Sequence, residues 1–138
     1  MSTLDSLYMT SLQSALNAGQ LRQQVYANNI ANVNTPGYKR EVVHFNSLLQ
    51  ARLAAYGLTS TPGLQMFANS ARDLGGATPF SSVNPVVATD AATQVSGNGN
   101  NVNIDAEMSA LAQNQVDYGA LVQDLQDQFA TLRTAITG

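Results

Sequence analysis

Apolar residues recur at helical spacing over the first 31 positions of the chain. Polar residues fill the intervening positions, as they do in a helix that buries one broad face. The residues on that face are Leu4, Leu7, Tyr8, Leu12, Ala15, Leu16, Ala18, Leu21 and Val25. Ser2 or Thr3 is suited to cap the start, and we expect Gly19 to mark a place of close packing. The pattern predicts a helix over residues 3–31.

A stricter repeat closes the chain. Apolar residues step by four and three, as in the a and d positions of a coiled coil, and Gln115 is the one polar member. The seam consists of Ile104, Met108, Leu111, Gln115, Tyr118, Val122, Leu125, Phe129, Leu132 and Ile136. Asn103 or Asp105 is suited to cap this helix. We expect one long helix here that packs along its seam.

The segment between the helices has little periodicity. The segment Thr35 to Tyr38 predicts a type II turn, because Pro36 fixes φ and Gly37 tolerates a positive φ. Beyond it the sequence predicts short extended segments at 42–45, 85–89 and 93–95, and a short helix from Asn46 to Tyr56. Breaker residues are frequent elsewhere in this middle.

These elements predict a mainly α fold built on two long terminal helices. The closing helix would be about 50 Å long at 1.5 Å per residue, and a compact domain of this size is only about 30–35 Å across. We therefore expect an elongated antiparallel pair in which residues 1–33 and 104–137 form one helical core domain. Residues 34–103 would supply a turn, a short helix and an irregular, β-containing linker region.

The low charge of the chain changes this picture. Charged residues are 11% of its 138 residues, the net charge is −3, and Lys39 is its one lysine. A nucleic-acid partner is not expected, because nothing supplies a basic face. The positions beside the closing seam are mostly uncharged, whereas a solvated two-stranded coiled coil usually carries Lys and Glu there. We expect this helix to be contacted on several sides by other protein chains.

No group of residues has the spacing of a reaction centre. The chain has no cysteine, which excludes thiol chemistry and thiolate metal sites. His44 is the single histidine, and Asp117 and Asp124 lie a heptad apart on the closing helix. We expect no catalytic residue, cofactor, metal or small-molecule substrate. The basic residues Lys39 and Arg40 are expected either in solvent or against acidic residues of a neighbour.

The segment from Ala27 to Lys39, with the sequence ANNIANVNTPGYK, resembles the signature of bacterial flagellar axial proteins. The residues of this turn motif are Asn28, Asn29, Asn32, Thr35, Pro36, Gly37 and Tyr38. In that family, paired terminal helices form the inner core of a helical tube. The short length and the closing segment from Gly99 to Ile136 are similar to those of the short proximal-rod proteins.

The resemblance implies a structural subunit that self-assembles into a helical rod. Its expected partners are other flagellar rod subunits and the MS-ring and export-gate proteins, in the periplasmic rod of the basal body. The expected assembly interface is Leu4, Leu7, Leu12, Val25, Ile30, Met108, Leu111, Tyr118, Val122, Leu125, Phe129, Leu132 and Ile136. The alternatives are another short subunit of the same rod and a soluble helical adaptor or chaperone.

The resemblance also implies a route out of the cytoplasm. The opening residues lack the basic stretch of a cleavable secretory signal, so we expect export by the flagellar type III system instead. Phe45 with Leu49 is similar to the export-gate motif of rod and hook subunits, an aromatic residue with an apolar one four positions later. Such pairs are also common on helices for packing alone.

Overall fold

The computed structural model describes residues 3–55, 82–91 and 97–137. In chain order its elements are α1 (Thr3–Ala31), β1 (Glu41–His44), α2 (Asn46–Ala55), β2 (Val86–Thr89) and α3 (Ile104–Thr137). The fold is mainly helical, as the sequence predicts. The predicted strand at 93–95 and the helix residue Tyr56 lie outside the described residues.

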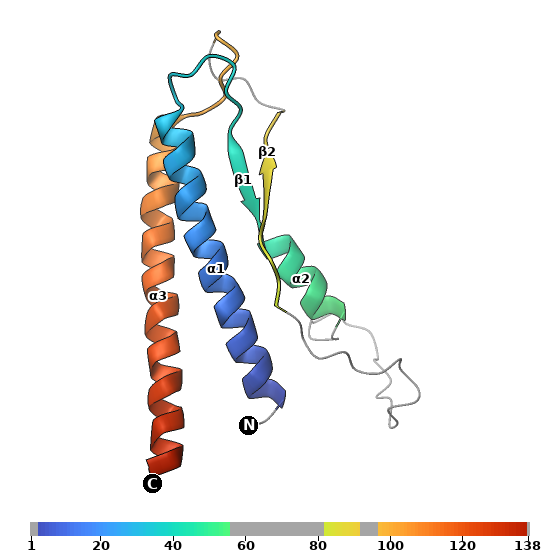
Figure 1. The fold of residues 1–138 in the computed structure, drawn as a ribbon, viewed down its shortest axis with the longest axis vertical. Coiled ribbons are helices and arrows are strands. Elements are labelled where there is room, and N and C mark those ends of the chain that lie inside the picture. Colours follow the sequence, from blue (N-terminus) through green and yellow to red (C-terminus); the bar gives the residue numbers. More distant parts are fainter. Residues whose placement is uncertain (1–2, 56–81, 92–96, 138) are drawn as a thin grey trace.

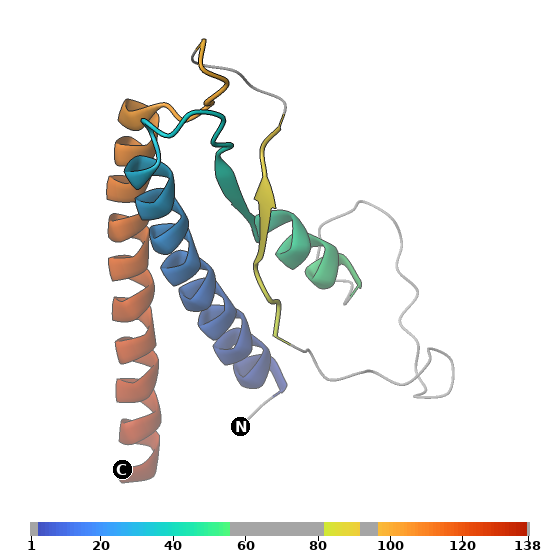
Figure 2. The same ribbon diagram turned by 45° about the horizontal axis from the view of Figure 1, so that its top comes forward.

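Helices α1 and α3 run antiparallel and pack side by side, so both termini lie at one end of an elongated molecule (Figures 1 and 2). We call this the open end, and the opposite end, where the chain turns from α1 toward β1 and from β2 toward α3, the closed end. Helix α3 begins with a cap, because Asn103 Oδ1 accepts the N–H groups of Asp105 and Ala106 at 3.0 and 3.2 Å. Among the described residues, no helix is both long and apolar enough to span a membrane.

Close packing of the two long helices explains Gly19. A Cβ atom at this position would lie 3.0 Å from Cδ2 of Tyr118, which is tighter than ordinary van der Waals contact. The Gly19 carbonyl oxygen also accepts a 2.9 Å hydrogen bond from Nδ2 of the buried Asn114. The expectation that Gly19 marks a close approach is confirmed.

The two strands form an antiparallel pair beside α1, on the side away from α3 (Figure 1). Their register pairs Glu41 with Thr89 and His44 with Val86. The predicted extended segment at 42–45 is therefore nearly right, although the strand starts one residue earlier and ends before Phe45.

Phe45, the residue that follows the strand, is buried in a small core. It packs with Ala18 and Val83, and Ala15 and Leu49 border this cluster. Polar contacts hold the same region: the Val83 N–H donates to Ser14 Oγ at 3.1 Å. The Arg22 guanidinium lies 5.9 Å from the centre of the Phe45 ring, at cation–π distance.

The closing seam is not buried as a single stripe. Leu111, Tyr118, Leu125 and Leu132 are half-buried along α3, but Met108 and Phe129 are 56% and 55% exposed and Ile136 is 84% exposed. With Ile104 and Gln115, which are also exposed, half of the seam residues are not covered in the single chain, and the expectation that other chains contact this helix stays a prediction. These seam residues are uncovered because α1 packs against a face rotated away from the seam, which carries polar residues at the positions described below.

Candidate assembly surface

The turn after α1 has the predicted type II geometry. Gly37 has a φ of 72°, and the Tyr38 N–H donates to the Thr35 carbonyl oxygen at 3.3 Å. Asn32 lies just beyond the helix and its Nδ2 donates to the Asn28 carbonyl oxygen at 2.9 Å. These contacts make the motif a helix stop and a chain reversal.

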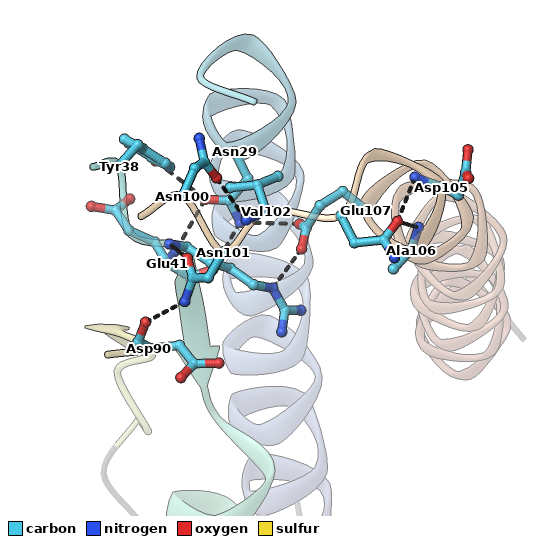
Figure 3. Close-up of polar contacts among 12 residues, drawn as sticks. Asn29, Tyr38, Glu41, Asp90, Asn100, Asn101, Val102, Asp105, Ala106 and Glu107 are labelled. Atoms are coloured by element: carbon cyan, nitrogen blue, oxygen red, sulfur yellow. Dashed lines mark hydrogen bonds and ion pairs between the residues drawn. The ribbon is translucent and has the colours of Figure 1, made fainter. Parts of the chain in front are cut away.

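Asn29 is a buried residue of this motif with a wider role. Its Nδ2 donates to the Glu41 carbonyl oxygen at 2.9 Å and to Glu107 Oε2 at 3.0 Å. Its Oδ1 accepts the Glu41 N–H at 3.0 Å and the Tyr38 hydroxyl at 3.2 Å. One fully buried amide thus links α1 to the turn, to β1 and to the start of α3 (Figure 3).

Glu107 is the buried charge of this region, with its side chain 1% exposed. Arg40 Nε donates to Glu107 Oε1 at 2.5 Å, and the Arg40 side chain is 31% exposed. A buried carboxylate requires such a partner, because desolvation is costly for an unpaired charge. The expectation that Arg40 meets solvent or a neighbouring chain is wrong: it pairs with an acidic residue of its own chain.

The Asn100 side chain lies among backbone carbonyl oxygens just after the end of α1. Its Nδ2 lies 2.9 Å from each of the carbonyl oxygens of Asn32, Val33 and Thr35. Its Oδ1 accepts the Val102 N–H at 2.7 Å. The side chain is therefore a tertiary cap for carbonyls that the helix end leaves without partners.

Asn101 joins the strands to the same region. Its Oδ1 accepts the Arg40 N–H at 2.6 Å and its Nδ2 donates to the Asp90 carbonyl oxygen at 2.6 Å (Figure 3). Nearby, Lys39 Nζ donates to the Gly99 carbonyl oxygen at 2.8 Å. We call Asn29, Arg40, Asn100, Asn101 and Glu107 the polar cluster.

Sequence reasoning identified only Asn29 among these five as a site residue. The available signal was the recurrence of Asn in two runs, ANNIAN at residues 27–32 and GNNVN at residues 99–103, which lie at the end of the first long helix and before the start of the second. Buried amides need several partners each, so two such runs indicate mutual contact.

Tyr38 has a perturbed ionisation as a consequence of this environment. Burial raises the pKa of its hydroxyl above the usual value, and the negative charges of Glu41 and Glu107 raise it further. The neutral hydroxyl that donates to Asn29 is thereby favoured.

Three lines of residues along α3 describe its surfaces. The inner line consists of Glu107, Asn114, Leu121 and Gln128, all of which are buried or half-buried. The middle line is Leu111, Tyr118, Leu125 and Leu132, which are half-buried. The outer line is Met108, Gln115, Val122, Phe129 and Ile136, of which Met108, Gln115, Phe129 and Ile136 are the more exposed members. Ile104, at the start of the seam, is 40% exposed.

The open end is joined by a different kind of contact. The Tyr8 hydroxyl donates to the Asp124 carboxylate. This hydrogen bond is the main reason that the pKa of Tyr8 is raised, with partial desolvation and the Asp124 charge adding to it. Phe129 and Ile136 lie beyond this contact toward the C-terminus and are largely exposed.

The remaining interface residues on α1 fall into two groups. Leu12 and Val25 are each 4% exposed, so they are covered by their own chain. Leu7 and Ile30 are half-buried, and the side chain of Leu4 lies outside the described residues. In this conformation the free apolar surface therefore belongs mainly to α3.

Among the described residues, the side chains that could bind a metal ion are not clustered. Within the described ranges no three His, Cys, Asp or Glu side chains lie close enough together to hold a metal ion. His44 is exposed at the end of β1.

Comparison with known proteins agrees with the motif and the geometry. The sequence profile of a family described as "Flagella basal body rod protein" matches residues 9–39, which cover most of α1 and the turn. The flagellar basal body rod protein FlgB of Bacillus subtilis is 36% identical over 128 residues, 93% of this chain and 92% of that protein. This chain belongs to the FlgB family of flagellar basal-body rod proteins.

Other members extend the similarity across bacteria. FlgB of Borreliella burgdorferi is 38% identical over 100 residues, 71% of this chain and 72% of that protein. FlgB of Salmonella typhimurium is 30% identical over 126 residues, 91% of this chain and 90% of that protein. The family places this rod protein in the flagellar basal body, as a structural subunit of its rod.

Proposed function

We propose that this rod protein builds the proximal part of the rod by packing the free face of α3 against neighbouring subunits. The observation that carries the proposal is the exposure of the outer line, with Met108, Phe129 and Ile136 all more than half exposed. Large apolar side chains at helical spacing rarely remain in water on a stable monomer. The relatives described above are FlgB proteins, which favours this subunit over another short rod subunit and over an adaptor.

The proposed contacts are heterologous and do not close. When a surface on α3 contacts a different surface of the next subunit and the contacts do not close into a ring, the subunits form a helical filament rather than a symmetric dimer. The partners are then other rod subunits along the tube and, at its base, the MS-ring and export-gate proteins. The working unit is the helical core of residues 1–33 and 104–137, and residues 34–103 are the region that connects its two helices. The unit acts as structure, without catalysis.

Two substitutions on adjacent lines of α3 test this proposal. Phe129→Asp places a charge on the outer line. Because position 129 is exposed in the single chain, we expect the isolated variant to keep its helical circular dichroism. Because the charge would be buried against the next subunit, we expect rod assembly and swimming to be lost. Leu125→Asp, on the half-buried middle line, removes assembly as well and also weakens the hairpin. Both variants are expected to be exported normally.

The measurements are swimming in soft agar and the amount of subunit in purified basal bodies. Gln113→Asp, at an exposed position of the same helix, is the matched control and leaves both unchanged. Normal swimming with Phe129→Asp would mean that the outer line is not an assembly surface.

We propose further that Phe45 and Leu49 direct the chain to the flagellar type III export gate. In the folded chain Phe45 is 4% exposed and packs against Ala18 and Val83. A gate that reads this side chain must therefore meet it before α1, β1 and the segment before β2 have packed together.

The export proposal is tested by secretion into the medium. Phe45→Ala and Leu49→Ala are expected to reduce secreted subunit several-fold. Val83→Ala damages the same core cluster without changing the motif, so it is expected to be secreted at the normal level. Equal loss with Val83→Ala would show that core packing, and not the motif, accounts for the effect.

A further inference from the structure

The face that α3 turns toward α1 is less apolar than the face it leaves free. The inner line carries Glu107, Asn114 and Gln128 beside a single apolar residue, Leu121. The outer line carries one polar residue, Gln115, and four apolar ones: Met108, Val122, Phe129 and Ile136. The middle line is shared by both faces. Hydrophobic burial alone would favour the opposite arrangement, with the outer line against α1.

The two arrangements differ by a small rotation. Inner and outer lines are one residue apart along the helix, so they are separated by about 100° around its axis. In the structure, α1 contacts the inner and middle lines. If α3 turned about its own axis by about 50°, half of that angle, the middle and outer lines would contact α1 instead. The middle line would remain in the contact throughout.

Specific polar contacts oppose this rotation. Glu107 Oε2 accepts from Asn29 Nδ2 at 3.0 Å and Glu107 Oε1 accepts from Arg40 Nε at 2.5 Å. Two turns farther along α3, Asn114 Nδ2 donates to the Gly19 carbonyl oxygen at 2.9 Å. Both Glu107 and Asn114 are at most 5% exposed, so rotation would leave buried partners without their hydrogen bonds.

We propose that Glu107 and Asn114 are positioning residues that set the rotation of α3 and thereby keep its outer line free for another chain. The analogous use of a buried polar residue is to fix register and partner choice in coiled coils, at a cost in stability. The purpose of the device rests on the proposed function, but the rotation itself is a property of the single chain.

Single cysteines report the rotation directly, because the natural chain contains none. Gln115→Cys marks the exposed outer line and Leu121→Cys marks the half-buried inner line, both near the middle of α3. With Glu107 and Asn114 intact, the thiol at position 115 of the purified chain is expected to react with a thiol reagent about fivefold or more faster than the thiol at position 121. In the background Glu107→Leu with Asn114→Leu, the order of the two rates is expected to reverse.

The controls separate rotation from a general change of the helix. Glu107→Gln keeps the shape of the side chain and one acceptor oxygen, so it retains one of the two hydrogen bonds that Glu107 accepts from Asn29 and Arg40. Gln113→Leu with Gln123→Leu adds apolar surface on the side of α3 away from the seam. Both are expected to keep the thiol at position 115 the faster of the two. If the double leucine variant loses its helical circular dichroism, Asn114→Leu alone is used, and the ratio of the two rates must fall.

Equal rates in the chain with Glu107 and Asn114 intact would overturn the proposal. So would an unchanged ratio in the folded leucine variants. Neither result bears on assembly, which the Phe129→Asp experiment measures separately in cells, so a failure of this proposal and a failure of the proposed function can be told apart.

Discussion

The closed and open ends of the α1–α3 pair are held by different kinds of contact. At the closed end, five side chains of the polar cluster bond α1, the turn, the strands and α3 to one another. At the open end, the hydrogen bond from Tyr8 to Asp124 joins the helices, while Phe129 and Ile136 remain exposed. Figure 1 shows the two helix ends there without a covering loop among the described residues.

This difference indicates a division of labour. Directional hydrogen bonds between buried groups determine one geometry, because displaced donors and acceptors lose their partners. Apolar contact is less directional and can be completed by any surface of suitable shape. The closed end therefore fixes how the helices meet, and the open end leaves apolar surface that another subunit can cover.

The largest expected effect on stability comes from the closed end. Asn100→Ala leaves three carbonyl oxygens of the turn and the Val102 N–H without their side-chain partner. We expect a loss of about 2–3 kcal/mol in the free energy of unfolding. Urea denaturation followed by circular dichroism measures it.

A matched control for this prediction lies in the same turn. Asn34→Ala changes the same residue type at an exposed position and is expected to alter stability by less than about 0.5 kcal/mol. Equal effects of the two substitutions would contradict the role assigned to the Asn100 side chain.

Substitutions at the two glycines of the long helices are expected to change stability by smaller amounts and in opposite directions. Gly19→Ala forces a Cβ to within 3.0 Å of the Tyr118 ring, so we expect a net loss of about 1 kcal/mol despite the better helix propensity. At Gly119 a Cβ would meet nothing within 4 Å, so Gly119→Ala is expected to stabilise the isolated chain by about 0.5–1 kcal/mol.

Thermal melting of the two variants checks the sign of each change. If the more stable Gly119→Ala chain no longer supports swimming, position 119 contacts a neighbouring subunit in the rod. Stabilisation by Gly19→Ala would mean that the helices separate more easily at Gly19 than the Tyr118 contact implies.

The smallest effect concerns pH at the open end. The pKa of Tyr8 is raised in the folded chain by its hydrogen bond to Asp124, with desolvation next. A raised folded pKa contributes stability that is fully present below the unfolded value of about 10 and is lost as pH rises through the folded pKa. Tyr8→Phe should therefore flatten the fall in unfolding free energy above that pH, while Tyr38 still contributes in both proteins.

Denaturation curves between neutral and alkaline pH measure this difference. An identical alkaline slope for the natural chain and Tyr8→Phe would show that the Tyr8–Asp124 bond does not persist in solution.

The sequence by itself determined the local elements and the family. The apolar repeat predicted both long helices within a residue of their observed ends, because hydrophobic periodicity and breaker residues act over neighbouring positions. Pro36 and Gly37 likewise determined the turn, since the backbone restrictions of these residues are local. The turn motif was also sufficient to indicate the flagellar rod family.

Only the tertiary structure decided which face of α3 is covered. The seam from Ile104 to Ile136 is the most apolar stripe, yet the buried partners of Asn29 and Gly19 are the polar Glu107 and Asn114. Periodicity records how apolar each face is, but it carries no information about hydrogen bonds between residues 78 or 95 positions apart in the chain. Those bonds set the rotation of the helix because their geometry is directional, whereas hydrophobic burial tolerates several rotations.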